Sequence, residues 1–213
     1  MTSLPPKAEL IDQLIDAGRH AVDRGLVVAS GGNLSARLAG GEGFLVTASG
    51  TWLDRLGPGD FTVVGPDGAV RGGHPTPSVE WRLHHRTYQA RPDVGAVVHL
   101  HPQHAVLVDA LGQPIRLLTL DHALYLRAVG RVPFLPAGSA ELAEAAADAA
   151  RDHDAIVLAF HGCSTLGDTV AMALRRALNL EEAAVATFRC LQLGDRDTAF
   201  PAEWLARLAG LRP

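Results

Sequence analysis

The sequence predicts a single α/β domain with a mixed, mostly antiparallel central sheet that helices cover on both faces. Short strand-like runs separated by glycines follow one N-terminal helix, and helical stretches then alternate with apolar runs. No internal repeat or linker divides the 213 residues, of which 47% are hydrophobic. We therefore expect residues 1–213 to form one domain around one core.

The first third of the chain predicts a helix followed by a meander. Apolar side chains recur at helical spacing over residues 7–24, and Gly25 ends the pattern. Strand-like runs follow at residues 33–38, 44–47, 61–65 and 69–71. Residues 65–68, Gly-Pro-Asp-Gly, have the composition of a hairpin turn between the last two runs.

After Pro77 the pattern lengthens and helices alternate with strands. We expect helices over residues 78–89, 104–111, 122–129, 139–151 and 169–193, and strands over residues 94–100, 132–135 and 155–160. The glycine-bounded stretch after residue 160 indicates a turn. Residues 201–211 predict a terminal helix within a C-terminal tail of residues 200–213.

The charge balance argues against polyanionic partners. The chain has 19 basic and 23 acidic residues, a net charge of −4 and a pI of about 6.2, so it lacks the basic field that binds nucleic acid or an anionic membrane. Cys163 and Cys190 form no disulfide framework, and the N-terminus lacks the pattern of a secretory signal. We expect a cytoplasmic protein with no nucleic-acid or membrane partner.

Histidines are concentrated in the middle of the chain, where seven of the ten lie between His74 and His122. His99 and His101 stand at the end of a Val-rich run, and residues i and i+2 of a strand project from the same face. Two such imidazoles can bind one metal ion. From the spacing alone, a pair of satisfied polar side chains at a strand end is an equally good interpretation.

Two further residues extend this set. His161 follows an apolar run and precedes Gly162, so it too would emerge at a strand end, where ligand-binding groups collect in α/β sheets. Glu80 falls in the first turn of a predicted helix, where the helix dipole is an alternative explanation. Three imidazoles and a carboxylate make a plausible catalytic zinc set. We assign no role to five other histidines, which lie at helical or loop spacings: His20, His84, His85, His104 and His153.

Three short segments could bind an anion. Residues 30–35, 47–50 and 76–78 each offer hydroxyl groups and unhindered backbone N–H groups. Each alone is better explained by ordinary turn and cap chemistry, but together they could cradle a phosphate. The chain contains neither G-x-x-x-x-G-K-[ST] nor G-x-G-x-x-G, so a nucleotide has no support.

The ordered motifs resemble the class II aldolase/adducin family over about residues 9–193. They are Ser-Gly-Gly-Asn-Leu-Ser-Ala-Arg at 30–37, Thr-Ala-Ser-Gly at 47–50, Pro-Ser-Val-Glu-Trp-Arg-Leu-His at 77–84, Tyr-Gln-Ala-Arg-Pro-Asp at 88–93, Ala-Val-Val-His-Leu-His at 96–101, and His-Gly at 161–162. The resemblance implies one Zn²⁺ per subunit, held by His99, His101, His161 and, in the resting state, Glu80. It also implies a phosphate pocket of Gly32, Asn33, Ser49, Gly50 and Ser78, and a cyclic homotetramer with active sites at subunit borders.

The implied reaction is a retro-aldol cleavage of a 2-ketose 1-phosphate, of the L-fuculose 1-phosphate kind, to dihydroxyacetone phosphate and a small aldehyde. Glu80, displaced by the substrate, would exchange the proton with the enediolate carbon. The same chemistry also supports an L-ribulose-5-phosphate type 4-epimerase or a sugar-acid-phosphate decarboxylase. A non-catalytic adducin-like scaffold is a further alternative, although such domains tend to lack the metal histidines.

The chain departs from the family pattern at two places. Val79 replaces a serine of the usual Pro-Ser-Ser-Glu motif, which removes a hydrogen bond to a charged partner worth about 1.5–3 kcal/mol. In the aldolases a neighbouring subunit contributes a tyrosine as proton donor to the aldehyde oxygen. Here the corresponding segment places His122 nearest to the expected position and Tyr125 three residues later, so either could serve.

Overall fold

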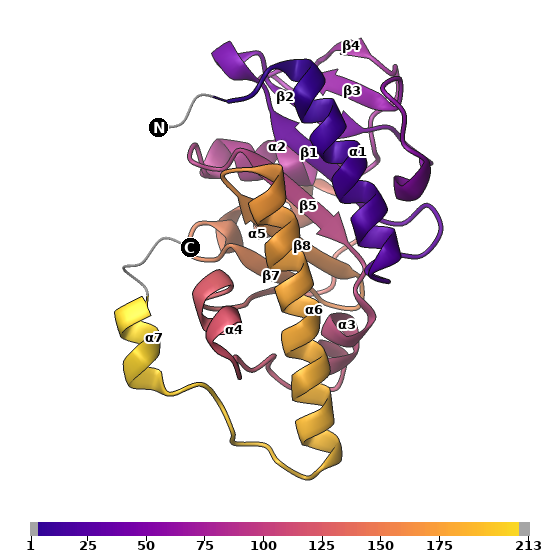
Figure 1. Ribbon diagram of the computed structural model, residues 1–213. Coiled ribbons are helices and arrows are strands. Elements are labelled where there is room, and N and C mark those ends of the chain that lie inside the picture. Colours follow the sequence, from indigo (N-terminus) through magenta and orange to yellow (C-terminus); the bar gives the residue numbers. More distant parts are fainter. Residues whose placement is uncertain (1–3, 209–213) are drawn as a thin grey trace.

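The central sheet is mixed and mostly antiparallel, as predicted. In this computed structural model, which describes residues 4–208, eight strands form one sheet in the order β4-β3-β2-β1-β5-β8-β7-β6 (Figure 1). Only β6 and β7 pair in parallel; the other neighbours are antiparallel. The strands are β1 (Asn33–Arg37), β2 (Phe44–Thr47), β3 (Phe61–Val64), β4 (Val70–Gly73), β5 (Ala96–Leu100), β6 (Gly130–Val132), β7 (Ala155–Leu158) and β8 (Gly162–Gly167).

Helices cover both faces of the sheet, as predicted. One core cluster joins the sheet to α1, α3 and α6, and a second cluster joins its other face to α2 and α5. The helices are α1 (Lys7–Asp23), α2 (Trp81–Ala90), α3 (Gln103–Ala110), α4 (Leu120–Tyr125), α5 (Ala140–Ala150), α6 (Val170–Gln192) and α7 (Ala202–Leu208), with short 3-10 turns at Ala39–Gly41 and Leu53–Arg55.

Strand β5 lies at the centre of the sheet and is buried on both faces. Val98 and Leu100 belong to the cluster of α1, α3 and α6, whereas Val97 belongs to the cluster of α2 and α5. Because side chains alternate along a strand, His99 shares the face of Val97. The strand therefore directs His99 toward the start of α2.

Helix α6 supports the opposite face of the same strands. The Thr169 hydroxyl accepts a hydrogen bond from the backbone N–H of Met172 and caps the helix at the residue where the sequence predicts its start. Four of its eight buried residues are alanine. Small side chains let the helix approach β5 and β8 closely, which fixes the position of the strands that carry the histidines.

The predicted turn after residue 160 is wrong, because the chain forms strand β8 there. Its polar residues Ser164 and Thr165 are buried, and the strand pairs with β5 on one side and β7 on the other. The Thr165 hydroxyl donates to the carbonyls of Val98 and Ala173. Pairing on both sides overrides a composition that is locally typical of turns.

The boundaries of several other elements also differ from the predictions, those of β6, α4 and β7 among them. The strand expected at 132–135 is β6, Gly130–Val132, and the helix expected at 122–129 is α4, Leu120–Tyr125. Strand β7 ends at Leu158 because Phe160 adopts a φ of 57°, which turns the chain toward β8. Helix α7 lies within the expected tail, and residues 209–213 of that tail lie outside the described residues.

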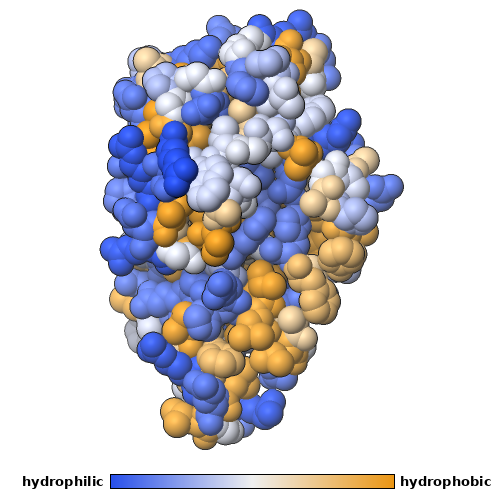
Figure 2. Space-filling model, turned by 90° about the vertical axis from the view of Figure 1, so that its right-hand side faces the viewer, coloured by the Kyte–Doolittle hydropathy of each residue, from blue (hydrophilic) through white to orange (hydrophobic). Residues whose placement is uncertain are grey.

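Apolar side chains gather on the lower half of the face shown in Figure 2, the side of the molecule on which α3 lies. Leu107 in α3 and Leu111 directly after it are among the exposed large hydrophobic residues. Within residues 4–208 no helix is both long and apolar enough to cross a membrane.

Candidate metal centre

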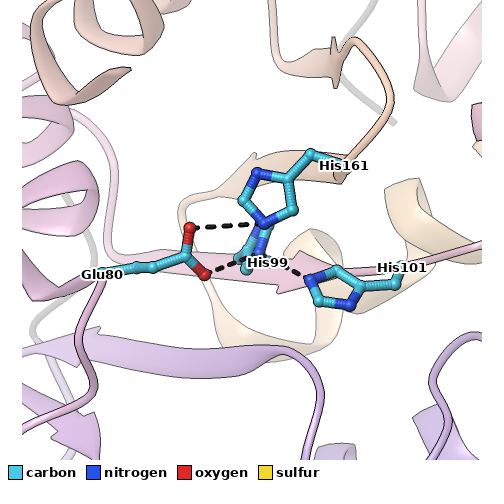
Figure 3. A group of neighbouring side chains, drawn as sticks. All are labelled: Glu80, His99, His101 and His161. Carbon is cyan, nitrogen blue, oxygen red and sulfur yellow. Dashed lines mark hydrogen bonds and ion pairs between the residues drawn. The ribbon is translucent and has the colours of Figure 1, made fainter. Parts of the chain in front are cut away.

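Four predicted ligands meet at one point in the structure (Figure 3). His99 lies in β5, His101 directly after it, His161 between β7 and β8, and Glu80 at the N-cap position of α2 rather than inside its first turn. One nitrogen or oxygen atom of each residue lies within 4.8 Å of those of the others. Residues up to 81 positions apart in the chain therefore share one site.

The donor atoms face one another at short range. His99 Nε2 lies 2.9 Å from Glu80 Oε2 and 3.0 Å from His101 Nε2, and His161 Nε2 lies 3.4 Å from Glu80 Oε1. Tetrahedral zinc ligands at about 2.0–2.1 Å from the ion are about 3.3 Å apart. The spacing of the donors thus matches a small divalent ion.

The chemistry of the donor set also fits a metal ion. His99 Nδ1 lies 2.9 Å from the carbonyl oxygen of Cys163 and donates to it, which leaves a lone pair on Nε2 when the ring is neutral. That lone pair faces the Glu80 carboxylate and the His101 ring. Glu80 Oε1 is buried without a hydrogen-bond partner. A divalent cation at this point would satisfy all of these acceptors at once.

Local backbone features explain why these residues can converge. The β5–β8 register pairs Leu100 with Cys163 and brings Gly162 against the end of β5. A Cβ atom on Gly162 would lie 2.3 Å from the Leu100 oxygen and 2.7 Å from a ring carbon of His101. Only glycine fits between these groups, so the His-Gly pair that ends the β7–β8 turn is a steric requirement of the site.

The electrostatic environment keeps the donors in their metal-binding form. Burial, together with the neighbouring His99 and His161, lowers the pKa of His101 to about 4, and burial followed by His99 lowers the pKa of His161. Burial opposes ionisation of Glu80, but its contacts with His99 and with the Asn33 amide outweigh burial and lower its pKa to about 2. At neutral pH these two imidazoles are uncharged and the carboxylate is ionised.

The predicted anion-binding segments lie beside this cluster. The Ser78 N–H donates to Thr47, the Ser49 N–H donates to Thr76, and Ala48 pairs with Pro77. These backbone hydrogen bonds hold the end of β2 against the segment that leads into Glu80. Gly50 adopts a φ of 75° at this turn, and a Cβ on Gly32 would lie 2.8 Å from the His99 oxygen. Asn33 Nδ2 donates to Glu80 Oε2 at 3.1 Å.

The family described as "Class II Aldolase and Adducin N-terminal domain" matches residues 12–187 of this chain. The chain belongs to that family. The resemblance inferred from its motifs is confirmed.

Individual relatives of this class II aldolase family member support the same assignment. The chain is 37% identical over 199 residues to a 5-methylthioribulose-1-phosphate/5-deoxyribulose-1-phosphate aldolase of Rhodospirillum rubrum, covering 92% of this chain and 87% of the relative. It is 35% identical over 175 residues to an L-fuculose phosphate aldolase of Methanocaldococcus jannaschii, covering 82% and 93%. A solved L-fuculose 1-phosphate aldolase superposes with a TM-score of 0.88 at 26% identity, covering 96% of each chain.

These relatives are named aldolases, and this family member is accordingly an enzyme of the aldehyde-lyase class. Its four-residue cluster suits the divalent metal on which class II aldolases depend. The relatives carry different substrate names, so family membership leaves the sugar phosphate open.

The two candidate proton donors lie in α4, outside the group of four converging donors. His122 is fully buried; its Nδ1 accepts the Leu118 N–H, and its Nε2 faces Glu182 of α6 at 3.8 Å. Tyr125 is half-buried, and the Arg175 guanidinium lies over its ring at 5.3 Å. Both side chains contact residues of α6, and neither belongs to the group of four converging donors.

His84 is the residue near the site that sequence reasoning missed. Helical spacing suggested a surface or supporting side chain, but the ring is fully buried and its Nε2 is hydrogen-bonded to Asn33 Oδ1. Its position four residues after Glu80 on the same helix is a signal that could have been used, since residues i and i+4 of a helix lie on one face.

Proposed function

We propose that this enzyme cleaves a 2-ketose 1-phosphate to dihydroxyacetone phosphate and an aldehyde. The observation that carries the proposal is the convergence of His99, His101, His161 and Glu80 beside the anion-suited loops, in a member of the class II aldolase family. We assign Zn²⁺, one per subunit, to these four residues. When bound there, it supplies Lewis-acid polarisation of the substrate carbonyl and hydroxyl oxygens.

Glu80 performs the proton transfer at carbon in this proposal. When the C3–C4 bond breaks, its electron pair stays with the C1–C3 fragment as an enediolate, and the C4 hydroxyl gives its proton to the residue that, in the reverse direction, donates a proton to the aldehyde oxygen. Glu80, which is ionised in the resting site, takes up a proton from solvent when the substrate displaces it and delivers that proton to C3. Asn33 anchors one Glu80 oxygen, while the other has no hydrogen-bond partner and is available for this transfer.

The phosphate would bind to the paired segments next to Glu80. We assign the phosphate to Gly32, Asn33, Ser49, Gly50 and Ser78; Ser78 stands two residues before the catalytic carboxylate, and Asn33 donates to that carboxylate. Val79 itself is 64% exposed and offers no hydrogen bond. The phosphate therefore depends on Ser78, the 47–50 turn and backbone N–H groups.

An apolar rim favours a substrate whose far end is apolar. Phe160 precedes His161, Val79 precedes Glu80, and Phe134 follows β6; the three are 63%, 64% and 61% exposed. Parallel pairing of Val132 with Leu158 brings Phe134 and Phe160 to the same end of β6 and β7. A Cβ on Gly138 would lie 2.8 Å from the Val79 oxygen, so the segment after Phe134 runs against Val79.

Such a rim suits a deoxy or thioether carbon better than a hydroxylated one, because apolar surface gains by excluding water. The Rhodospirillum rubrum relative is named for 5-methylthioribulose 1-phosphate and 5-deoxyribulose 1-phosphate, which end in such groups. L-fuculose 1-phosphate, the substrate named for the other relatives, also ends in a methyl group but carries a hydroxyl on C5, where these two ketose phosphates carry none. We therefore place the two ketose phosphates without a C5 hydroxyl ahead of it.

We further propose that the enzyme is a homotetramer in which a neighbouring subunit supplies the proton donor for the aldehyde oxygen. Tyr125 is our choice over His122, because Tyr125 is half-buried whereas the His122 ring is enclosed and faces Glu182. A donor that acts across a subunit border must reach the surface.

The test is a cleavage assay of zinc-loaded protein with dihydroxyacetone phosphate measured by a coupled reductase. We expect activity on 5-deoxyribulose 1-phosphate with kcat/KM at least about tenfold above that for L-fuculose 1-phosphate, the size of effect expected for one buried apolar group. No cleavage of any 2-ketose 1-phosphate would overturn the aldolase proposal. Product analysis then identifies an epimerase by an unchanged carbon count and a decarboxylase by released CO₂.

A further inference from the structure

A chain of buried hydrogen bonds runs from the metal cluster into the core. Asn33 Nδ2 donates to Glu80 Oε2 at 3.1 Å, and Asn33 Oδ1 is bonded to His84 Nε2. His84 Nδ1 lies 2.7 Å from the Ser35 hydroxyl, which lies 2.8 Å from the Tyr88 hydroxyl. All five side chains are buried.

The chemistry of these groups permits one direction for the bonds. The Asn33 amide donates to the Glu80 carboxylate through Nδ2, so its oxygen faces His84 and must receive a proton from His84 Nε2. The neutral ring then accepts at Nδ1 from the Ser35 hydroxyl, and Ser35 accepts from Tyr88. Burial, then His99, lowers the pKa of His84 to about 3, which keeps the ring neutral.

We propose that His84 is a positioning residue for the catalytic carboxylate, because its Nε2–H holds the Asn33 amide in the orientation that directs the NH₂ group at Glu80. A 180° turn of the Asn33 amide would place its oxygen against the Glu80 carboxylate and remove the anchor of Oε2. His84 makes that turn unfavourable, since the NH₂ group would then face the N–H of the imidazole. This role rests on the proposed function of Glu80.

The first test compares substitutions at His84 with a matched control on the same helix. His84→Leu removes both ring nitrogens, and His84→Gln retains an N–H donor near the position of Nε2. His85→Gln is the control, since the His85 ring is bonded instead to the Pro66 carbonyl. Rates are expressed per bound zinc and compared with circular dichroism, so that loss of folded or loaded protein is not counted as a catalytic defect.

We expect His84→Leu to lower kcat by about 10- to 100-fold while KM changes less than about threefold, because the lost interaction orients a group that acts in the transition state. His84→Gln should recover kcat to within about fivefold of wild type, and His85→Gln should match wild type. An unchanged kcat in folded, zinc-loaded His84→Leu, or a His84→Gln variant as slow as His84→Leu, would overturn the inference.

The second test needs no activity and separates this inference from the proposed function. In ¹⁵N-histidine-labelled wild-type protein, the His84 resonances should show the Nε2–H tautomer, and in Asn33→Leu the Nε2–H signal should shift or exchange faster with water. A His84 ring protonated at Nδ1 instead would refute the positioning role even in an active aldolase. If the protein shows the expected tautomer but cleaves no ketose phosphate, the His84–Asn33 hydrogen bond is supported and the proposed reaction is wrong.

Discussion

Acidification should destabilise the folded protein through His84. The ring is fully buried, and burial with the neighbouring His99 lowers its pKa from 6.5 to about 3. Below pH 6.5 the His84 ring therefore binds a proton in the unfolded chain, whereas in the folded chain it binds one only near pH 3. Because the unfolded state binds more protons between these values, the free energy of unfolding falls as the pH falls through this window. Between pH 7 and pH 5 the loss due to His84 alone is about 2 kcal/mol, at about 1.4 kcal/mol per unit below 6.5.

Urea denaturation of metal-free wild type and His84→Gln at pH 7 and pH 5 measures this quantity. Other titrating groups contribute equally to both proteins, so the difference between their pH-dependent losses isolates His84. Wild type should lose about 2 kcal/mol more than the variant, and His85→Gln, which keeps the buried ring, should lose as much as wild type. Equal losses in wild type and His84→Gln would show that the ring charges as readily in the folded state as in the unfolded one, and would refute the argument from burial.

Three further predictions concern the metal and the proton donor. His161→Ala should weaken zinc binding by at least about tenfold in competition with a chromophoric chelator, because one of four converging donors is lost; retention of wild-type affinity would remove His161 from the site. Chelation should abolish cleavage but preserve the far-UV circular dichroism spectrum, because both core clusters consist of apolar side chains and include none of the metal donors. Unfolding on chelation would instead indicate a structural ion. Tyr125→Phe should lower kcat by about 10²- to 10⁴-fold at unchanged zinc content. If Tyr125→Phe has the wild-type rate and His122→Gln is slow, His122 is the proton donor instead.

Local patterns in the chain were sufficient for much of the architecture. The helical periodicity of residues 7–24 and the start of the long helix at Thr169 agree with α1 and α6 to within a residue or two. The Val-rich run that leads into His99 and His101 correctly placed both histidines at the end of a strand, with His99 in β5 and His101 directly after it. These features are encoded by side chains within one or two turns or a few strand positions of one another, which is the range over which periodicity is informative.

Strand β8 shows where such patterns fail. Residues 162–167, Gly-Cys-Ser-Thr-Leu-Gly, have little strand character of their own, yet every one is buried between β5 and β7. The partners of the Thr165 hydroxyl are 8 and 67 residues away in the chain. A short segment cannot show partners at that distance, so its composition was interpreted as a turn.

His84 illustrates the same limit within the site. The spacing on α2 shows that it shares a face with Glu80, but nothing in the sequence shows that this face is covered by Asn33 and Ser35 of β1. The sequence by itself determined which residue types could hold a metal ion, which segments are helical and to which family the chain belongs. Tertiary structure alone decided that four donors separated by up to 81 positions meet within 4.8 Å, and that a buried imidazole supports their carboxylate. The physical reason is that convergence and burial arise from strand order and packing between distant segments, whereas the sequence specifies directly only the interactions of near neighbours.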